Sequence, residues 1–335
     1  MRKLLLLGTV LTAFSLAMPA AYADHDGDGG YGNKTPVTFD VAIAAALAGN
    51  QGNVAGNHAS SESQAISTSI SGSYNGSKGV SNTNQNAGAN SALQNALALS
   101  YIQGCNCATT TKPTTIAAGG ALAAAGNSGE VEHNSSRSSR EFTYGGKLGF
   151  GPNTTVAATI DGSFDNATGV FQVNQNSGDN SLLQNAAAVA AATGLKGSTD
   201  LGVTVAAAGN SGEVERNKAS ADHTKTSATI NNSFNNDKGV VNANQNAGAN
   251  SQLQNASALA SLKFCGCATD NIGLSIAAAG NEGGVYGNWA SAENGSNGAS
   301  MSSSFNGSQG MLQANQNAGA NSLLQNSVAV GVITH

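Results

Sequence analysis

The four cysteines are the residues of this chain whose type and spacing most directly suggest chemistry. They form two Cys-x-Cys pairs, Cys105 with Cys107 and Cys265 with Cys267. In an oxidising compartment such pairs favour structural disulfides, formed within a pair or between the pairs. Four thiolates could instead hold a metal ion, but structural zinc sites usually space their ligands as Cys-x₂₋₄-Cys. We expect disulfides at these four positions and no metal site.

Other candidate constellations lack an essential member. The segment Asp24–Gly29 reads like the first half of a calcium-binding loop, but Thr35 stands where that loop needs a bidentate glutamate. None of the five histidines has a nucleophile and a carboxylate at a repeated spacing, and there is no Gly-x-Ser-x-Gly elbow. The glycines are not followed by the Lys-Ser/Thr of a phosphate-binding loop. The sequence therefore predicts no catalytic residue, no cofactor and no enzyme.

The composition excludes further classes of protein. Only 10% of the 335 residues are charged, against about 25% in an average globular protein. The net charge is −5 and no cluster of Lys and Arg occurs, so a nucleic-acid partner is not expected. Glycine contributes 43 residues and aromatic residues only 5%. Because bulky side chains are so few, something other than a conventional hydrophobic core must hold the chain together.

The N-terminal segment 1–23 has the pattern of a signal peptide. Arg2 and Lys3 precede an apolar run from Leu4 to Leu16, and Ala21 and Ala23 form a small-x-small cleavage site. The apolar run is shorter than the ~20 residues that a membrane-spanning helix needs. We therefore expect a mature chain that begins at Asp24 and is secreted to the cell surface or beyond it.

A short repeated motif organises the rest of the chain. The triplet Asn-x-Gly recurs at eight positions whose glycines are separated by 36, 41, 49, 34, 36, 35 and 36 residues. Two versions of the motif alternate along the chain, so the larger repeat unit contains one motif of each version and occurs four times. We expect a signal peptide (1–23), an acidic Gly-rich segment (24–40), repeat units at 41–104, 121–195, 196–264 and 272–335, and Cys-x-Cys linkers at 105–120 and 265–271. The second unit carries a 13-residue insertion near 140–152.

The repeats read as β-strands. Asparagine alternates with Ala or Gln over Asn242–Asn250, and this period of two is typical of a strand. Pro36, Pro113 and Pro152 all lie outside the repeat bodies, as expected where proline would interrupt a β ladder. The predicted fold is an all-β solenoid or cross-β stack of about eight rungs, with about 35 residues in each rung.

Stacking places equivalent residues ~4.8 Å apart, so their amide side chains can form ladders. An aromatic residue at a fixed offset in each unit would add a row with one ring at every second rung. The candidate ladder residues are Asn50, Asn86, Gln94, Asn127, Asn176, Gln184, Asn210, Asn246, Gln254, Asn281, Asn317 and Gln325, and the candidate aromatic row is Tyr74, Phe164, Phe234 and Phe305.

The repeats resemble those of Fap-type functional amyloid subunits. The segments Gly169–Asn180 and Gly310–Asn326 carry this resemblance, and Gln85–Gln94 is similar, over a short stretch, to a curlin repeat. The resemblance covers the four repeat regions. It departs at the cysteines, because Fap-type subunits carry Cys-x-x-Cys near the C-terminus whereas this chain has two internal Cys-x-Cys pairs. It implies an exported bacterial protein whose partners are further copies of itself, a related fibre or nucleator subunit and an outer-membrane export channel.

Two functions follow from these observations. In the first, the chain self-assembles into extracellular amyloid-like fibres of a biofilm matrix. In the second, it is a monomeric β-solenoid that acts as a surface adhesin or other binding module. A monomer needs capping repeats at its ends, whereas a polymer needs ends that accept another copy. The last repeat, Asn315–Asn326, matches the inner copies almost perfectly, which favours the fibre.

Overall fold

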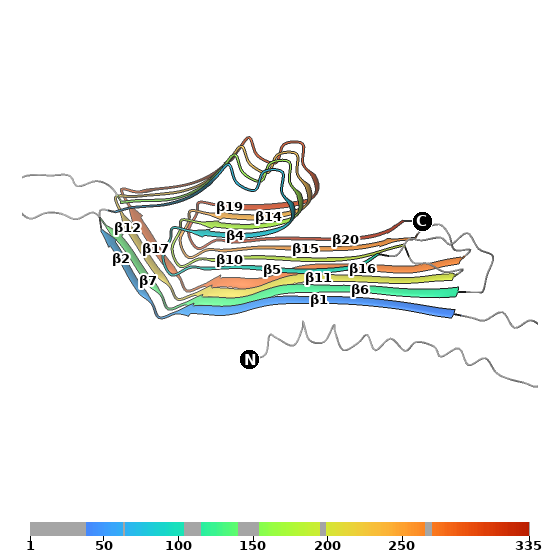
Figure 1. The fold of residues 1–335 in the computed structure, drawn as a ribbon. Coiled ribbons are helices and arrows are strands. Elements are labelled where there is room, and N and C mark those ends of the chain that lie inside the picture. The colour runs from blue at the N-terminus through green and yellow to red at the C-terminus, as the bar shows by residue number, and fades with distance from the viewer. Residues whose placement is uncertain are drawn as a thin grey trace, which may run out of the picture.

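The computed structural model describes residues 38–62, 64–103, 115–139, 154–194, 199–264 and 270–334. These residues form twenty β-strands and no helix, and the strands pair in parallel in five four-stranded sheets (Figure 1). No described helix is therefore long and apolar enough to span a membrane. The predicted all-β repeat fold is confirmed.

The twenty strands form four layers of five strands each, and the layers stack along one axis. Layer 1 holds β1 (Thr38–Ala55), β2 (His58–Glu62), β3 (Ala65–Ser71), β4 (Lys78–Asn86) and β5 (Ala92–Gln103). Layer 2 holds β6 (Thr115–Glu132), β7 (Ser135–Ser139), β8 (Thr154–Asp161), β9 (Thr168–Asn176) and β10 (Leu182–Thr193). Layer 3 holds β11 (Thr199–Glu215), β12 (Lys218–Asp222), β13 (Thr224–Asn231), β14 (Lys238–Asn246) and β15 (Gln252–Lys263). Layer 4 holds β16 (Asp270–Tyr286), β17 (Trp289–Glu293), β18 (Ser296–Ser302), β19 (Gln309–Asn317) and β20 (Leu323–Thr334).

The first strands of the four layers form sheet A, the second strands sheet B, the third sheet C, the fourth sheet D and the fifth sheet E. Sheet E packs against sheet A through alanines such as Ala96, Ala188 and Ala206. The opposite side of sheet E packs on sheet D, where Val170 and Val240 meet Ala187. The other side of sheet D packs on sheet C through phenylalanine and isoleucine. Four sheets thus lie face to face in the order A, E, D, C. Figure 1 shows sheets A, E and D one above another and sheet B at a corner.

The expected rung size was wrong by a factor of two. Asn50 pairs with Asn127, and Asn210 pairs with Asn281, so strand partners lie one full unit apart and there are four layers instead of eight. The two halves of a unit do not stack on each other because an 18-residue strand of one half has no counterpart in the other. They fold face to face within a layer instead, and side chains such as that of Asn127 bond to the backbone of the facing strand.

The number of residues that separates two paired positions, which we call the pairing offset, shows where layer 2 is longer than the other layers. Between layers 1 and 2 it is 77 residues up to β7 and 90 residues from β8 onward. Residues 140–153, which connect these strands, lie outside the described residues. The insertion therefore enters between two strands without altering the register of either.

Candidate assembly site

The first row of amides runs along sheet A. Asn50 Nδ2 donates to Asn127 Oδ1 at 3.0 Å, and the same bond continues to Asn210 and Asn281 at 2.8 Å each. Asn127 and Asn210 also donate to a backbone carbonyl of sheet E, at 2.7 and 2.8 Å. Both are 4% exposed, so these bonds satisfy buried amides while joining two sheets and two layers at once.

The second row, at the end of sheet D, makes a tight turn. Asn246 Nδ2 donates to Asn176 Oδ1 at 2.8 Å and to the carbonyl of Gly248 at 2.7 Å, while its Oδ1 accepts from the Gly248 amide. The row comprises Asn86, Asn176, Asn246 and Asn317. A Cβ on Gly248 would lie 1.8 Å from the carbonyl oxygen of Gly319 in the next layer. The glycine of this motif is required because the turns of successive layers touch through their backbones.

The third row is glutamine. Gln184, Gln254 and Gln325 each donate at 2.7 Å to the glutamine one layer before, and the row begins at Gln94. Gln184 and Gln254 also reach backbone carbonyls of sheet A. The twelve candidate ladder residues thus lie in three rows of four, with one member of each row in every layer. Their role in a fibre is a proposal developed below.

Sequence analysis missed a further set of amides buried between sheets D and E. Asn244 donates to Asn174 and Asn185, and Asn255 donates to Asn244, all at 2.9–3.1 Å. The adjacent Gln245 faces the other way and donates to the Ser300 carbonyl of sheet C. The alternation of Asn with Ala or Gln along this strand is the signal for these amides, because neighbouring side chains in a strand point to opposite faces. The alternation does not show that both faces of sheet D are covered, by sheet E on one side and by sheet C on the other.

The aromatic residues form a continuous stack, and the expected spacing at every second rung was wrong. The centroid distances are 4.7 Å for Tyr74–Phe164, 4.7 Å for Phe164–Phe234 and 5.0 Å for Phe234–Phe305, with ring planes within 10°. Since each layer is a whole unit, each layer contributes one ring. All four residues have a positive φ of 60–63°. The stack therefore offsets a backbone conformation that is unfavourable for side chains of this size.

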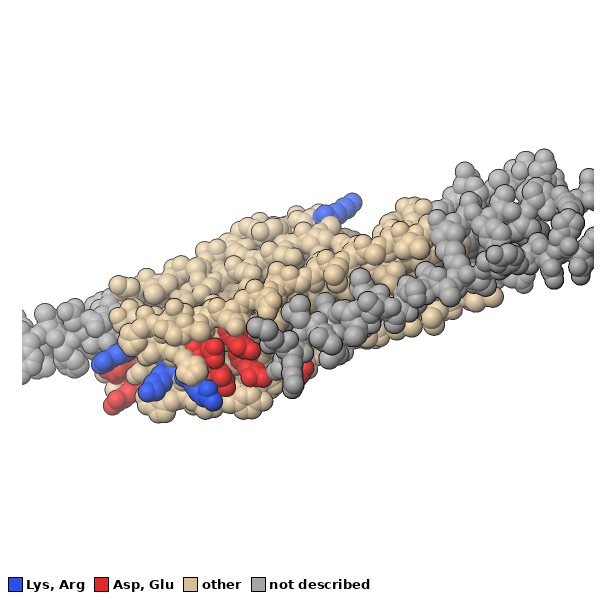
Figure 2. Space-filling view, turned by 90° about the horizontal axis from the view of Figure 1, so that it is seen from below, with Lys and Arg blue, Asp and Glu red and all other residues tan. Residues whose placement is uncertain are grey.

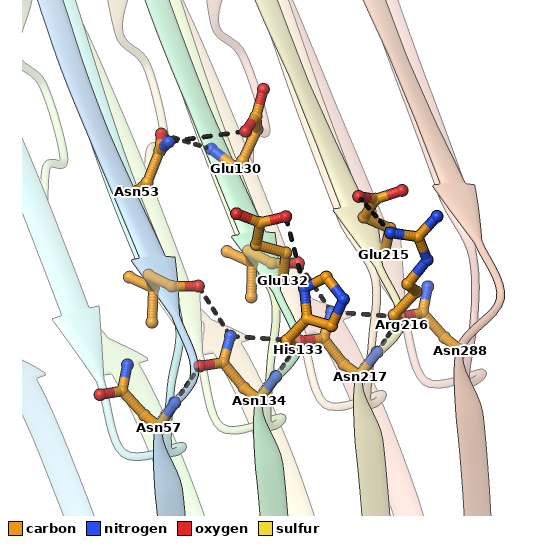
Figure 3. A network of polar contacts seen from close by, with 12 residues as sticks. Asn53, Asn57, Glu130, Glu132, His133, Asn134, Glu215, Arg216, Asn217 and Asn288 are labelled. Atoms are coloured by element: carbon orange, nitrogen blue, oxygen red, sulfur yellow. Dashed lines mark hydrogen bonds and ion pairs between the residues drawn. The ribbon is translucent and has the colours of Figure 1, made fainter.

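A further asparagine row holds the corner between sheets A and B (Figure 3). The backbone amide of Asn134 donates to Asn217 Oδ1 at 2.9 Å, and that of Asn217 donates to Asn288 Oδ1 at 2.8 Å. Each Nδ2 also donates to the backbone carbonyl of a valine in the preceding layer. Asn134 donates to Val54 and Asn217 to Val131, each at 2.7 Å. Each is the last residue of one of the two versions of the repeat motif, Ala-Gly-Asn-x-Gly-x-Val-x-x-Asn.

Charged residues gather beside this corner, at the ends of the sheet A strands (Figure 2). Glu130 pairs in register with Glu213, and Glu132 with Glu215. His133 Nδ1 lies 3.5 Å from Glu132, and Arg216 lies 3.7 Å from Glu215. Layers 2 and 3 therefore tolerate stacked like charges at the solvent-facing side of a strand, where water screens them and the Arg216 guanidinium lies beside Glu215.

Three carboxylates lie in the interior of layers 2 and 3. Burial raises the pKa of Asp179, although hydrogen bonds from the Ala89 amide and Ser136 Oγ oppose that rise. Burial also raises the pKa of Asp200. Asp237 is fully buried, and burial raises its pKa to about 6 despite a hydrogen bond from the Ala167 amide. Burial thus shifts all three carboxyl groups toward the protonated form relative to an exposed aspartate.

The two terminal layers expose apolar side chains that the inner layers bury. Among the described residues, exposed large hydrophobic side chains number six in layer 1, nine in layer 4 and one, Leu201, in layer 3. Tyr74, for example, is 45% exposed, whereas its stacking partner Phe164 is fully buried. The end layers thus lack only the neighbour that every inner layer has.

The cysteines lie outside the described residues, so their pairing stays a prediction. Their positions follow the ends of β5 in layer 1 and β15 in layer 3, with β10 of layer 2 between them. In the part of the chain that the structure describes, no three His, Cys, Asp or Glu side chains are grouped as metal ligands.

Comparison with known proteins gives one match. The profile of the functional amyloid protein FapB/FapC family matches residues 145–333, more than half of the 335-residue chain. No curated protein and no solved structure matches. The matched segment runs from the residues before β8 into β20 and so contains the Asn-x-Gly turns, amide rows and aromatic rings of layers 3 and 4. The resemblance seen in the repeats is confirmed, and the chain belongs to the functional amyloid protein FapB/FapC family.

Proposed function

We propose that this protein is a secreted structural subunit that self-assembles, layer 4 onto layer 1, into extracellular amyloid-like fibres of a biofilm matrix. The exposure of apolar side chains in the two terminal layers carries the proposal. All strand pairs are parallel, so the two ends of the stack differ and only a head-to-tail contact continues the sheets.

The two ends match each other row by row. Extending the observed register by one layer sets Asn281 opposite Asn50 of the next copy, and Gln325 opposite Gln94. The Phe305 ring would meet Tyr74 of that copy, and Gly319 would meet Gly88. The new junction would therefore repeat the hydrogen bonds and ring contacts of the inner layers.

Export rests on the signal-peptide pattern of residues 1–23, and the biofilm matrix rests on the family. The proposed partners are further copies of the chain, a related fibre or nucleator subunit and an outer-membrane export channel. The proposed contribution of the protein is mechanical, and the amide rows and the aromatic row supply it.

The experiment is assembly of purified residues 24–335, followed by electron microscopy and fibre diffraction. We expect fibres with a ~4.8 Å meridional reflection. A chain that stays monomeric for days at high micromolar concentration would overturn the proposal and favour a monomeric adhesin.

A charge pair tests the junction itself. Ser69 and Ser300 are exposed on sheet C, and the extended register sets them opposite each other only across a junction. Within one chain they lie three layers or ~14 Å apart, beyond the screening length of about 8 Å at physiological salt. Ser69→Lys with Ser300→Lys should raise the critical concentration above that of Ser69→Lys with Ser300→Glu, by about fivefold to thirtyfold for about 1–2 kcal/mol. Equal values would refute the register.

A further inference from the structure

The two outermost faces of the four-sheet stack differ in character. The outward face of sheet C carries Ser67, Ser69, Thr159, Thr229 and Ser300. The outward face of sheet A carries apolar residues in every layer along the first half of its strands. Its four rows are Ile43–Gly120–Val203–Leu274, Ala45–Leu122–Val205–Ile276, Leu47–Ala124–Ala207–Ala278 and Gly49–Gly126–Gly209–Gly280.

No other described sheet packs on these four rows, which we name the apolar strip. In the terminal layers Ile43 is 56% exposed, Leu47 62%, Leu274 48% and Ile276 41%, whereas in the inner layers Ala124 and Val205 are each 7% exposed. The inner face of the same strands is alanine and is buried against sheet E. An apolar face this regular on one side only is typical of an interaction surface.

We propose that the apolar strip is the lateral contact by which two fibres of this chain pair face to face, sheet A against sheet A. The inference rests on the proposed axial assembly and names the second surface that such a fibre uses. The occupant is a second copy of this chain because the strip repeats with every subunit. Only a partner with the same four-layer repeat can match it along a whole fibre.

The area of the strip explains why the contact would belong to fibres and not to monomers. Seven residues by four layers cover about 23 Å by about 19 Å, or roughly 440 Å² per subunit. A pair of monomers would bury roughly 900 Å² in total, below the ~1,200 Å² of a stable interface. Two fibres of ten subunits would bury about ten times as much, so lateral pairing becomes strong only after axial growth.

The charges at the ends of the sheet A strands set the direction of pairing. The strand alternation places Glu130, Glu132, Glu213 and Glu215 on the same outward face, beyond the apolar strip, with Arg216 beside Glu215. Figure 2 shows acidic and basic side chains gathered at one end of this side of the molecule. Parallel packing of two strips would place glutamates against glutamates at close range. Antiparallel packing keeps the acidic ends apart and leaves apolar residues against apolar residues.

The test compares two lysine pairs with matched geometry. Leu47→Lys with Ile276→Lys charges the strip, while Ser67→Lys with Ser300→Lys charges the polar face of sheet C. In both variants one lysine lies in layer 1 and the other in layer 4. Across a junction between two subunits, the two positions are offset by two residues along the paired strands. The lysines therefore repel each other equally along the fibre axis in both variants. Fibre width is measured by electron microscopy, and axial order by the ~4.8 Å reflection.

We expect wild-type and Ser67→Lys/Ser300→Lys fibres to bundle, and Leu47→Lys/Ile276→Lys to give fibres at most half as wide with the same reflection. Bundles of unchanged width in the strip variant would overturn the inference and leave axial assembly standing. Loss of axial fibres in that variant alone would also overturn it, because the strip would then act along the axis. Single wild-type fibres that take up zwitterionic lipid vesicles would assign the strip to lipid and overturn it. Absence of wild-type fibres would overturn the proposed function and this inference together.

Discussion

The rings of Phe164 and Phe234 lie parallel, with centroids 4.7 Å apart and planes 5° apart, although 70 residues separate them in the chain. Both rings are fully buried. Their contact sets the register of two layers at the turn between sheets C and D, where the backbone is left-handed.

Truncation of Phe234 tests this stack. Phe234→Ala should lower the free energy of unfolding by about 3–5 kcal/mol, because a fully buried ring is removed. Phe234→Gly should cost no more than Phe234→Ala, since glycine accepts the φ of 60° at this position without strain. Tyr74→Ala, at the exposed end of the stack, is the control and should cost less. Guanidinium denaturation measures the free energy of unfolding of each variant. A glycine variant clearly less stable than the alanine variant would contradict this prediction.

Gly248, in the Asn-x-Gly turn at the end of sheet D, should tolerate no side chain. In Gly248→Ala the new Cβ would meet the Gly319 carbonyl oxygen at 1.8 Å, so the turns of two layers must separate. We expect a loss of more than about 3 kcal/mol, as for severe overpacking. Gly298→Ala is the control, since no atom lies within 4 Å of its Cβ, and it should change stability by less than about 0.5 kcal/mol. Similar urea midpoints for the two variants would show that the layers are not in contact at this turn.

Replacing a ladder amide by a carboxylate should block assembly near neutral pH. Asn246 Nδ2 donates to Asn176 Oδ1, Ser181 Oγ and the Gly248 carbonyl. Asn246→Asp would therefore set a buried carboxylate against the Asn176 amide oxygen and the Gly248 carbonyl, neither of which can donate. The cost is about 1–3 kcal/mol for each unsatisfied group. Assembly at pH 3 should recover in part because the protonated carboxyl regains one donor. Asn294→Asp, at an exposed turn, should assemble like the wild type, and equal inhibition at both sites in a dye-binding assay would refute the ladder.

Stability should depend on pH through Asp237. Its folded pKa, about 6, lies above the ordinary value of 3.8, so folding binds a proton between these values. The stabilisation is complete below pH ~4 and is lost as the pH rises through about 6. Asp237→Ser, which copies the residue of layer 4, should show a smaller fall in the urea midpoint between pH 4.5 and 7 than the wild type. Parallel curves for the two proteins would show that Asp237 does not titrate in this range.

The insertion of layer 2 should be dispensable. The pairing offset rises from 77 to 90 residues between β7 and β8 while both strands keep their partners. Deleting Arg140–Pro152 should therefore leave fibre formation unchanged, since insertions in connections cost little entropy. Deleting an equally long segment of layer 3, Thr224–Asn236, is the control and should abolish it, because this segment contains β13. Loss of fibres in the first deletion would mean that the insertion is part of a layer.

The sequence by itself determined the repeat, the strand period and the amide residues that recur in every unit, because each depends on local spacing. An asparagine that recurs once in every unit must stack on its equivalents if the units stack, whatever the shape of the layer. Alternation over Asn242–Asn250 likewise indicated two opposite faces without showing what would cover them.

Only the tertiary structure decided the size of a layer and the order of its sheets. Both depend on contacts between residues far apart in the chain, such as Gln175 with the Thr229 carbonyl and Asn127 with the Asn185 carbonyl. The spacing of the Asn-x-Gly motifs is equally compatible with two half-units stacked along the axis and with two folded face to face in one plane. Packing selects the second arrangement, because only there do the alanine faces of sheets A and E close on each other while the aromatic rings meet in every layer.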